Sequence, residues 1–131
     1  MFFISPLLQT ILYKMKNILK LEELAIASLA IYYLTTLHIG INQWWHILLF
    51  FAPDISMLGY LFGKKTGAIV YNIFHHKLNA AIILVLGIIS HNNYLLLSGA
   101  ILFGHSAFDR IMGYGLKTFD GFKFTHLGNL N

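Results

Sequence analysis

Four long apolar stretches, separated by short polar segments, dominate the hydropathy pattern of the chain. They cover residues 21–39, 44–62, 66–89 and 94–116. Each contains 19–24 residues, and an α-helix needs ~20 to cross ~30 Å of hydrocarbon. The connections between them hold only three or four residues, so consecutive helices are expected to run antiparallel. The pattern predicts an all-α, polytopic membrane protein folded as a four-transmembrane-helix bundle.

The lysines indicate which side of the membrane each helix end faces. Those near the ends of the apolar stretches are Lys14, Lys16, Lys20, Lys64, Lys65, Lys117 and Lys123. The connections at residues 40–43 and 90–93 contain no Lys or Arg. With four crossings every basic segment lies on one face, which the positive-inside rule makes the cytoplasmic one. We therefore expect both termini in the cytoplasm, and Trp44 and Trp45 at the opposite interface.

The composition also favours a chain surrounded by lipid. Of the 131 residues, 57% are hydrophobic and 11% are charged, whereas a soluble domain carries roughly 25% charged residues. The net charge of +4 comes from dispersed cations, not from the basic face of a nucleic-acid-binding protein, so we expect the lipid bilayer and no nucleic acid as partner. The absence of Cys excludes disulfides and Cys-ligated zinc.

The chain is long enough for one domain. We assign residues 18–131 to a single membrane domain with a short cytoplasmic tail, and residues 1–17 to an interfacial segment or an upstream extension. The first apolar residues precede the lysines, which reverses the order found in a signal peptide. Met1 and Met15 are both candidates for the true start.

Ionisable residues inside three of the predicted helices mark a candidate functional site, because burying such groups in hydrocarbon is costly. They are Asp54, His75, His76, Lys77, His105, Asp109 and Arg110. At ~1.5 Å per residue, Asp54, His75 and His105 each lie ~14–16 Å from a membrane face and reach a similar level. His105 and Asp109 share one helix face, and Pro53 is expected to kink the helix before Asp54.

Two imidazoles and two carboxylates at one level suit a divalent metal ion. The predicted ligands are Asp54, His75, His105 and Asp109. Zn²⁺ is the preferred ion, with Mn²⁺ and Fe²⁺ as alternatives. A bound ion would activate water for hydrolysis. Glu22 is then the candidate general base, and Arg110 the candidate partner for a phosphate or carboxylate of an amphiphilic, lipid-like substrate.

Simpler pairings and other functions fit the same residues. His105 and Asp109 can hydrogen-bond to each other across one turn, and Asp54 can pair with Arg110 or Lys77. A small proton-coupled or ion transporter would use the His and Asp residues as a proton relay, and with four helices it would need to form a homo-oligomer. A non-enzymatic helper subunit would instead pack against a larger membrane protein.

Five runs of residues carry a family resemblance. They are residues 21–25, 52–60, 67–75, 105–117 and 125–128. Over about residues 19–128 the chain resembles an uncharacterised bacterial membrane family, domain-of-unknown-function family 4260. That family has Gly at the position of Glu23, which favours Glu22 as the functional carboxylate. The resemblance implies a multi-pass protein of the bacterial inner (cytoplasmic) membrane, with no known activity.

A more distant similarity is to the membrane-bound, metal-dependent hydrolase family. That family has Pro-Asp on one helix, His on a later one and His-x-x-x-Asp on another, which Pro53-Asp54, His75 and His105 with Asp109 match. The resemblance implies metal-dependent hydrolysis. The chain departs from the family by lacking its His-Arg-Gly-x-x-His-Ser run.

Overall fold

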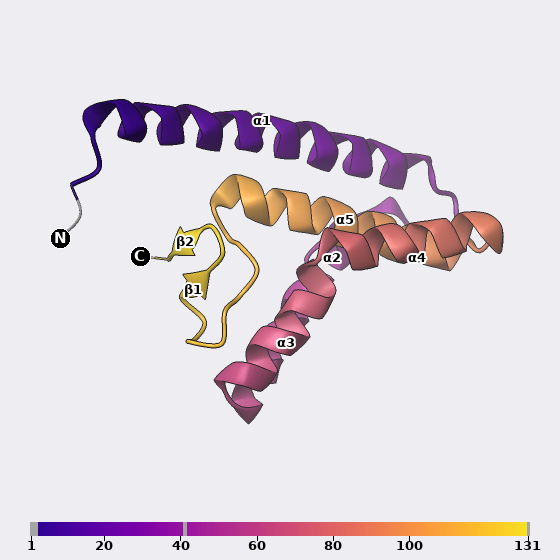
Figure 1. The fold of residues 1–131 in the computed structure, drawn as a ribbon. Coiled ribbons are helices and arrows are strands. Elements are labelled where there is room, and N and C mark those ends of the chain that lie inside the picture. Colours follow the sequence, from indigo (N-terminus) through magenta and orange to yellow (C-terminus); the bar gives the residue numbers. More distant parts are fainter. Residues whose placement is uncertain (1–2, 41, 131) are drawn as a thin grey trace.

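The computed structural model describes residues 3–40 and 42–130, and this part of the chain is mostly helical (Figure 1). Met1, one of the two candidate starts, lies outside the described residues. The elements are α1 (Pro6–Thr36), α2 (Gln43–Phe50), the 3₁₀ helix η1 (Ala52–Phe62), α3 (Lys64–His75), α4 (Lys77–Ile89), α5 (Asn93–Met112), β1 (Phe124–Thr125) and β2 (Gly128–Asn129).

α1 covers the first predicted helix as far as Thr36, three residues before the predicted end at residue 39, and extends it towards the N-terminus. It begins at Pro6, where the missing N–H of proline costs no hydrogen bond. The side chain of Ser5 caps this end by accepting a hydrogen bond from the Leu8 amide at 3.3 Å. Residues 6–17 of the predicted interfacial segment and residues 21–36 of the first predicted span therefore belong to one continuous helix of 31 residues.

The second predicted helix changes its form at Pro53. α2 ends at Phe50, and η1 continues the chain as a 3₁₀ helix. Proline has no N–H to donate and its ring clashes with an α-helical backbone. The Asp54 amide accordingly donates to the Phe51 carbonyl at 3.2 Å, three residues back. The predicted kink before Asp54 is thus a change of helix type.

The third predicted helix is broken at His76. α3 and α4 meet there at a bend of 44°. The break frees the backbone carbonyl of His75, which accepts hydrogen bonds from Ser106 Oγ at 2.9 Å and from Arg110 Nη2 at 3.3 Å. Side chains of α5 therefore satisfy the backbone group that the break exposes, as irregular backbone at membrane depth requires.

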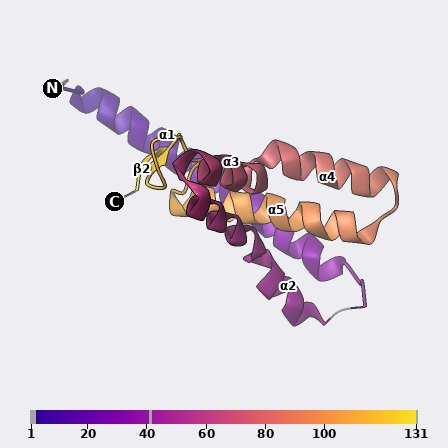
Figure 2. The ribbon, with the colours of Figure 1, turned by 90° about the horizontal axis from the view of Figure 1, so that it is seen from below.

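α5 is the central helix of the bundle. It packs along α1 on one side and α4 on the other (Figure 2), while α3 packs against η1. Figure 1 shows α3 turning away from the line of α4. A Cβ at Gly104 would meet Ala30 of α1 at 2.8 Å, so α1 and α5 approach closely where both carry small residues. A Cβ at Gly67 would likewise clash with the Tyr60 ring, so this glycine allows α3 to lie against η1.

α5 ends at Met112, before the predicted end at residue 116. Gly113 follows with φ +88°, a left-handed conformation that suits glycine. The Tyr114 amide then donates back to the Asp109 carbonyl at 2.8 Å. The tail beyond it folds into the antiparallel pair β1 and β2, with Phe124 opposite Asn129 and Thr125 opposite Gly128.

Two helical segments of the described chain are long and apolar enough to cross a membrane, Trp44–Phe62 and Asn93–Met112. α3 and α4 make a third if the bent pair is one span. α1 is not among these candidates. Four spans and the orientation of the termini therefore stay predictions.

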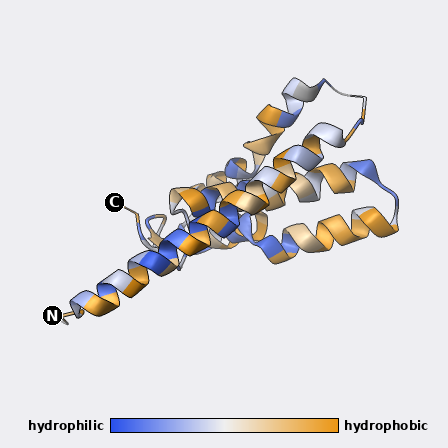
Figure 3. Cartoon of the chain, turned by 90° about the horizontal axis from the view of Figure 1, so that it is seen from above, coloured by the Kyte–Doolittle hydropathy of each residue, from blue (hydrophilic) through white to orange (hydrophobic). Residues whose placement is uncertain are grey.

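The outer surface of the bundle is apolar. Figure 3 shows hydrophobic residues recurring along the helices, with hydrophilic colouring at the α4–α5 connection. Leu61 and Phe62 at the end of η1 are 78% and 80% exposed, and Ile89 of α4 is 72% exposed. A soluble monomer rarely exposes apolar surface on this scale. The helices that can span a membrane and this surface indicate a membrane protein.

Candidate metal centre

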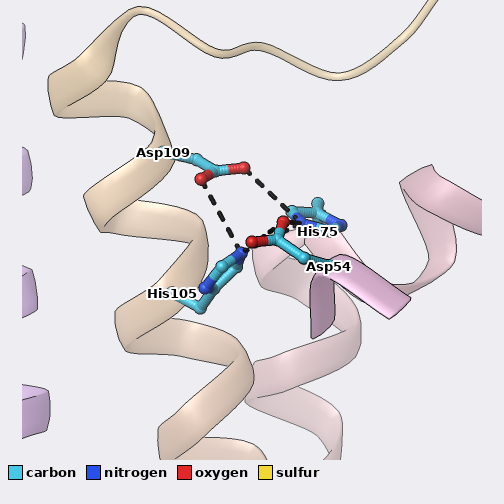
Figure 4. A group of neighbouring side chains, drawn as sticks. All are labelled: Asp54, His75, His105 and Asp109. Carbon is cyan, nitrogen blue, oxygen red and sulfur yellow. Dashed lines mark hydrogen bonds and ion pairs between the residues drawn. The ribbon is translucent and has the colours of Figure 1, made fainter. Parts of the chain in front are cut away.

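Four side chains from three elements converge at one point inside the bundle (Figure 4). Asp54 comes from η1, His75 is the last residue of α3, and His105 and Asp109 lie one turn apart on α5. Each offers one nitrogen or oxygen atom, and these four atoms lie within 4.8 Å of one another. His75, His105 and Asp109 are buried, while the side chain of Asp54 is 39% exposed. The group can hold a metal ion.

The imidazole nitrogens lie at the centre of this group. His105 Nε2 is 3.2 Å from His75 Nε2 and 3.2 Å from Asp54 Oδ1. His75 Nε2 is 3.6 Å from the same Asp54 oxygen. The two oxygens of Asp109 face one imidazole each, Oδ2 at 3.5 Å from His75 and Oδ1 at 3.7 Å from His105.

These separations can be compared with those in a coordination sphere. Ligand atoms at ~2.0–2.2 Å from a tetrahedral zinc ion lie ~3.3–3.6 Å from one another. The separations that involve the two imidazoles run from 3.2 to 3.7 Å. The separations around the two imidazoles are thus close to those of a coordination sphere, and one ligand atom from each of the four side chains lies within 4.8 Å of the others.

The orientation of His75 is set by its own helix. Its Nδ1 lies 2.9 Å from the backbone carbonyl of Tyr71, one turn earlier. A carbonyl can only accept, so Nδ1 carries a proton, and Nε2 is the ring nitrogen that faces the other three side chains. Histidine ligands of metal ions are commonly oriented by a hydrogen bond of this kind.

Tyr71 contacts two of the four residues. Its ring stacks on His75, with centroids 3.7 Å apart and an interplanar angle of 7°. Its hydroxyl donates to Asp109 Oδ2 at 2.7 Å. The side chain is 1% exposed, so Tyr71 orients an imidazole and a carboxylate from different helices at once.

His105 is enclosed by aromatic rings. Phe50 and Phe51 meet its ring edge-on, with centroids at 5.8 and 6.2 Å. Its Nδ1 is buried and makes no hydrogen bond to any described residue. The hydrogen-bonding capacity of His105 is therefore directed through Nε2 to the other members of the group.

The two carboxylates lack a conventional cationic partner. Among the described residues, Asp54 and Asp109 form ion pairs only with the two histidines. Arg110 donates instead to the carbonyls of Tyr114 and His75, at 2.8 and 3.3 Å. Two carboxylates this close in a low-dielectric setting need a compensating positive charge, which a proton shared within the group or a metal ion would supply.

The C-terminal tail is fixed to α3 beside the four residues. Asn72 donates to the Lys117 carbonyl at 2.9 Å and accepts from the Lys117 amide at 2.7 Å. The Lys117 ammonium then lies 4.9 Å from the centroid of the Tyr71 ring and 4.0 Å from that of Phe122. Burial lowers the pKa of Lys117. The tail thus places a buried cation over the ring of Tyr71.

Other residues considered from the sequence lie elsewhere. Glu22 is exposed on α1 and is not in the group of four. Lys77 forms an ion pair with Glu23 of α1 and not with Asp54. His76 is exposed and caps α4, where its Nδ1 accepts from the Leu78 amide at 3.2 Å. His126 Nδ1 accepts from the Leu116 amide at 2.8 Å within the tail.

Three polar residues that support the site were not singled out from the sequence. They are Tyr71, Asn72 and Ser106. Tyr71 lies four residues before His75, a spacing that puts both on one helix face, and this was the available signal. The partners of Asn72 and Ser106 lie 45 and 31 residues away in the chain, so no local pattern indicates them.

A family profile described as "Domain of unknown function (DUF4260)" matches residues 16–130. The chain belongs to this family, which confirms the resemblance seen in its sequence. No curated protein and no solved structure matches the chain. The similarity to the membrane-bound, metal-dependent hydrolase family therefore stays a prediction.

Proposed function

We propose that this member of the DUF4260 family is a metal-dependent hydrolase of the membrane that acts on an amphiphilic, lipid-like substrate. The observation that carries the proposal is the set of 3.2–3.7 Å separations around the two imidazoles. Three of the four residues are buried among apolar helices, and groups so costly to bury are kept at functional sites. The ligands are Asp54, His75, His105 and Asp109.

The proposal includes four membrane spans with both termini in the cytoplasm. α1 supplies the fourth span, because it packs lengthwise on α5, which is itself a candidate span. Its Lys14, Lys16 and Lys20 then lie at the cytoplasmic end. This is the arrangement of a multi-pass protein of the bacterial inner membrane, with the positive charges inside.

Two nitrogen and two oxygen ligands suit Zn²⁺ best, and they also accept Mn²⁺ or Fe²⁺. Such an ion, when bound, polarises a carbonyl or phosphoryl oxygen and lowers the pKa of water. Tyr71 holds Asp109 and His75 in place through its hydroxyl and its ring. Buried ligands of this kind form the rigid part of the site.

Asp54 is the ligand through which substrate and water would enter. Its side chain is 39% exposed, compared with 0%, 1% and 8% for His75, His105 and Asp109. A catalytic metal site keeps one position that can exchange, and the most exposed carboxylate is the one that can move aside. With a metal ion bound, Asp54 would be its most accessible ligand, and its carboxylate would be able to accept a proton from water.

Arg110 and Glu22 were also predicted to take part in the reaction. Arg110 donates to two backbone carbonyls, one of them that of His75, so it positions a ligand, and its binding of a substrate phosphate or carboxylate stays a prediction. Glu22 is exposed on α1 and does not belong to the group of four, and its role as general base stays a prediction.

Metal analysis of the purified full-length chain tests the proposal. We expect about one transition-metal ion per chain by mass spectrometry, loss of thermal stability in chelator, and metal-dependent hydrolysis of a long-chain para-nitrophenyl ester in mixed micelles. A protein without metal, whose stability chelator does not change, would contradict the proposal. Proton flux by such a metal-free protein in proteoliposomes would support the transporter instead.

A further inference from the structure

An apolar pocket of about 710 Å³ lies between α1, α2 and α5. Leu34, Ile47, Phe50, Phe51 and Phe108 supply much of its lining. A volume of this size lies within the ~300–1,000 Å³ range of ligand-binding sites. The part of the lining made by Phe50, Phe51 and Phe108 is held together by edge-to-face contacts, with centroids 5.5–6.2 Å apart.

The pocket adjoins the candidate metal centre. Phe50 and Phe51 line the pocket with the same rings that contact the His105 imidazole at 5.8 and 6.2 Å. The Asp54 amide donates to the Phe51 carbonyl, and Phe108 directly precedes Asp109. A molecule in the pocket would therefore lie within one aromatic ring of the proposed metal ligands.

One buried polar group interrupts the apolar lining. His46 borders the pocket and is 6% exposed, and its Nε2 makes no hydrogen bond to any described residue. Leaving a buried polar atom unpaired is costly. An occupant that carries a hydrogen-bonding group as well as hydrocarbon would satisfy this histidine, whereas a plain hydrocarbon would not.

A second cavity in the bundle provides a contrast. It measures about 370 Å³ and lies between α1, α4 and α5, where Ile26, Ile88 and Phe103 are among its lining residues. Its lining includes no histidine and neither of the phenylalanines, Phe50 and Phe51, that contact His105. It therefore lacks both features that connect the larger pocket with the proposed chemistry.

We propose that the pocket between α1, α2 and α5 binds the hydrocarbon chain of a single-chain amphiphile, such as a fatty acid or monoacylglycerol, whose polar group lies between His46 and the metal centre. This inference rests on the proposed function and names the substrate class of that site. The hydrocarbon chain of the amphiphile lies against Leu34, Ile47 and Phe108. The metal centre then meets the polar group at the end of the chain.

Photo-crosslinking of the full-length protein in dioleoylphosphatidylcholine vesicles tests this inference. The probe is palmitic acid with a diazirine in its chain, and the competitors are palmitic acid and monopalmitoylglycerol. Labelling that decreases when a competitor is added comes from a saturable binding site. Labelling of the lipid-facing surface does not decrease. We expect competitor to remove the labelling of residues 43–51, as mapped by mass spectrometry.

Two matched variants make the test specific. Ile47→Trp fills the larger pocket and Ile88→Trp fills the smaller one, and the two isoleucines are 55% and 62% exposed. Ile47→Trp should lower the competed labelling about tenfold or more, because the added bulk would occupy the space of the ligand's hydrocarbon chain. Ile88→Trp should leave it unchanged.

The inference and the proposed function fail in different ways. If the competitors do not reduce the labelling, or if the two variants are labelled equally, the pocket between α1, α2 and α5 does not bind the hydrocarbon chain. Bound metal in the same preparations would still support the proposed hydrolase. If the competitors reduce the labelling of a protein that binds no metal, the pocket is an amphiphile-binding site that has no link to hydrolysis.

Discussion

The Nε2 atoms of His75 and His105 lie 3.2 Å apart, although the two residues belong to different helices and are separated by 30 positions in the chain. The Nδ1 of His75 donates to the Tyr71 carbonyl, so Nε2 is the nitrogen through which this ring can bind a proton or a cation. Two nitrogens face each other closely only when a proton or a cation lies between them. Asp54 and Asp109 supply the negative charge that favours a cation there.

Removal of an imidazole should abolish stoichiometric metal binding. We expect His105→Ala to lower the affinity for Zn²⁺ by more than the ~10–100-fold that is typical when a residue outside the coordination sphere is lost. His91→Ala is the control, because His91 is exposed in the α4–α5 connection and lies outside the group of four. Titration against a chelating dye measures both affinities, and equal affinities would rule out the proposed ligand set.

Loss of the Tyr71 hydroxyl should weaken metal binding while the fold is kept. Tyr71→Phe keeps the stacked ring and removes the 2.7 Å hydrogen bond to Asp109. We expect a fall of ~10–100-fold in Zn²⁺ affinity. Tyr60→Phe is a matched control, because the Tyr60 hydroxyl is buried and has no hydrogen-bond partner among the described residues. If Tyr71→Phe and Tyr60→Phe bind Zn²⁺ with equal affinity, the Tyr71 hydroxyl does not support the metal site.

The tail should detach when the side chain of Asn72 is shortened. Asn72→Ala removes both hydrogen bonds to the Lys117 backbone, and each such bond stabilises by about 0.5–1.5 kcal/mol. Hydrogen exchange at the Lys117 amide should become faster, while exchange in α5 stays slow. Asn93→Ala, an exposed change at the start of α5, should leave the exchange of the tail as it is. Uniformly faster exchange would instead indicate general unfolding.

The tail should also loosen as the pH falls. Burial, and then the nearby Arg110 guanidinium, lower the pKa of His126 in the folded protein. The folded tail therefore binds fewer protons than the unfolded tail, and the stability that neutral His126 provides is present above pH ~6.5 and is lost as the pH falls through the folded pKa. Exchange of the Leu116 amide, which donates to His126 Nδ1, measures this loss.

The control for the pH effect is His126→Asn. The asparagine carbonyl can accept the Leu116 hydrogen bond in place of Nδ1, and it does not titrate. The pH dependence of exchange at Leu116 should disappear in this variant while the protection at pH 7 is largely kept. A pH dependence that persists would assign it to another group.

Much of the helical arrangement could be predicted from hydropathy alone. Each predicted stretch corresponds to one helix or to one pair of consecutive helices, because apolar runs of this length have no other stable form in lipid. The interruptions were only partly foreseen. Pro53 predicted a change in the second stretch, whereas the break at His76 has no proline or glycine to signal it. At that break Ser106 and Arg110 donate to the freed carbonyl of His75, and both lie more than 30 residues further along the chain.

The sequence by itself determined the kind of protein and the residues worth testing. Length and hydropathy select helices that lie in lipid, and the cost of burying charge there makes Asp54, His75, His105 and Asp109 conspicuous. Only the tertiary structure decided that their reactive atoms meet, and that Tyr71 holds two of them in place. Depth along a helix can be counted from residue numbers, but the face a side chain presents to another helix depends on the packing, the 3₁₀ turn after Pro53 and the bend at His76.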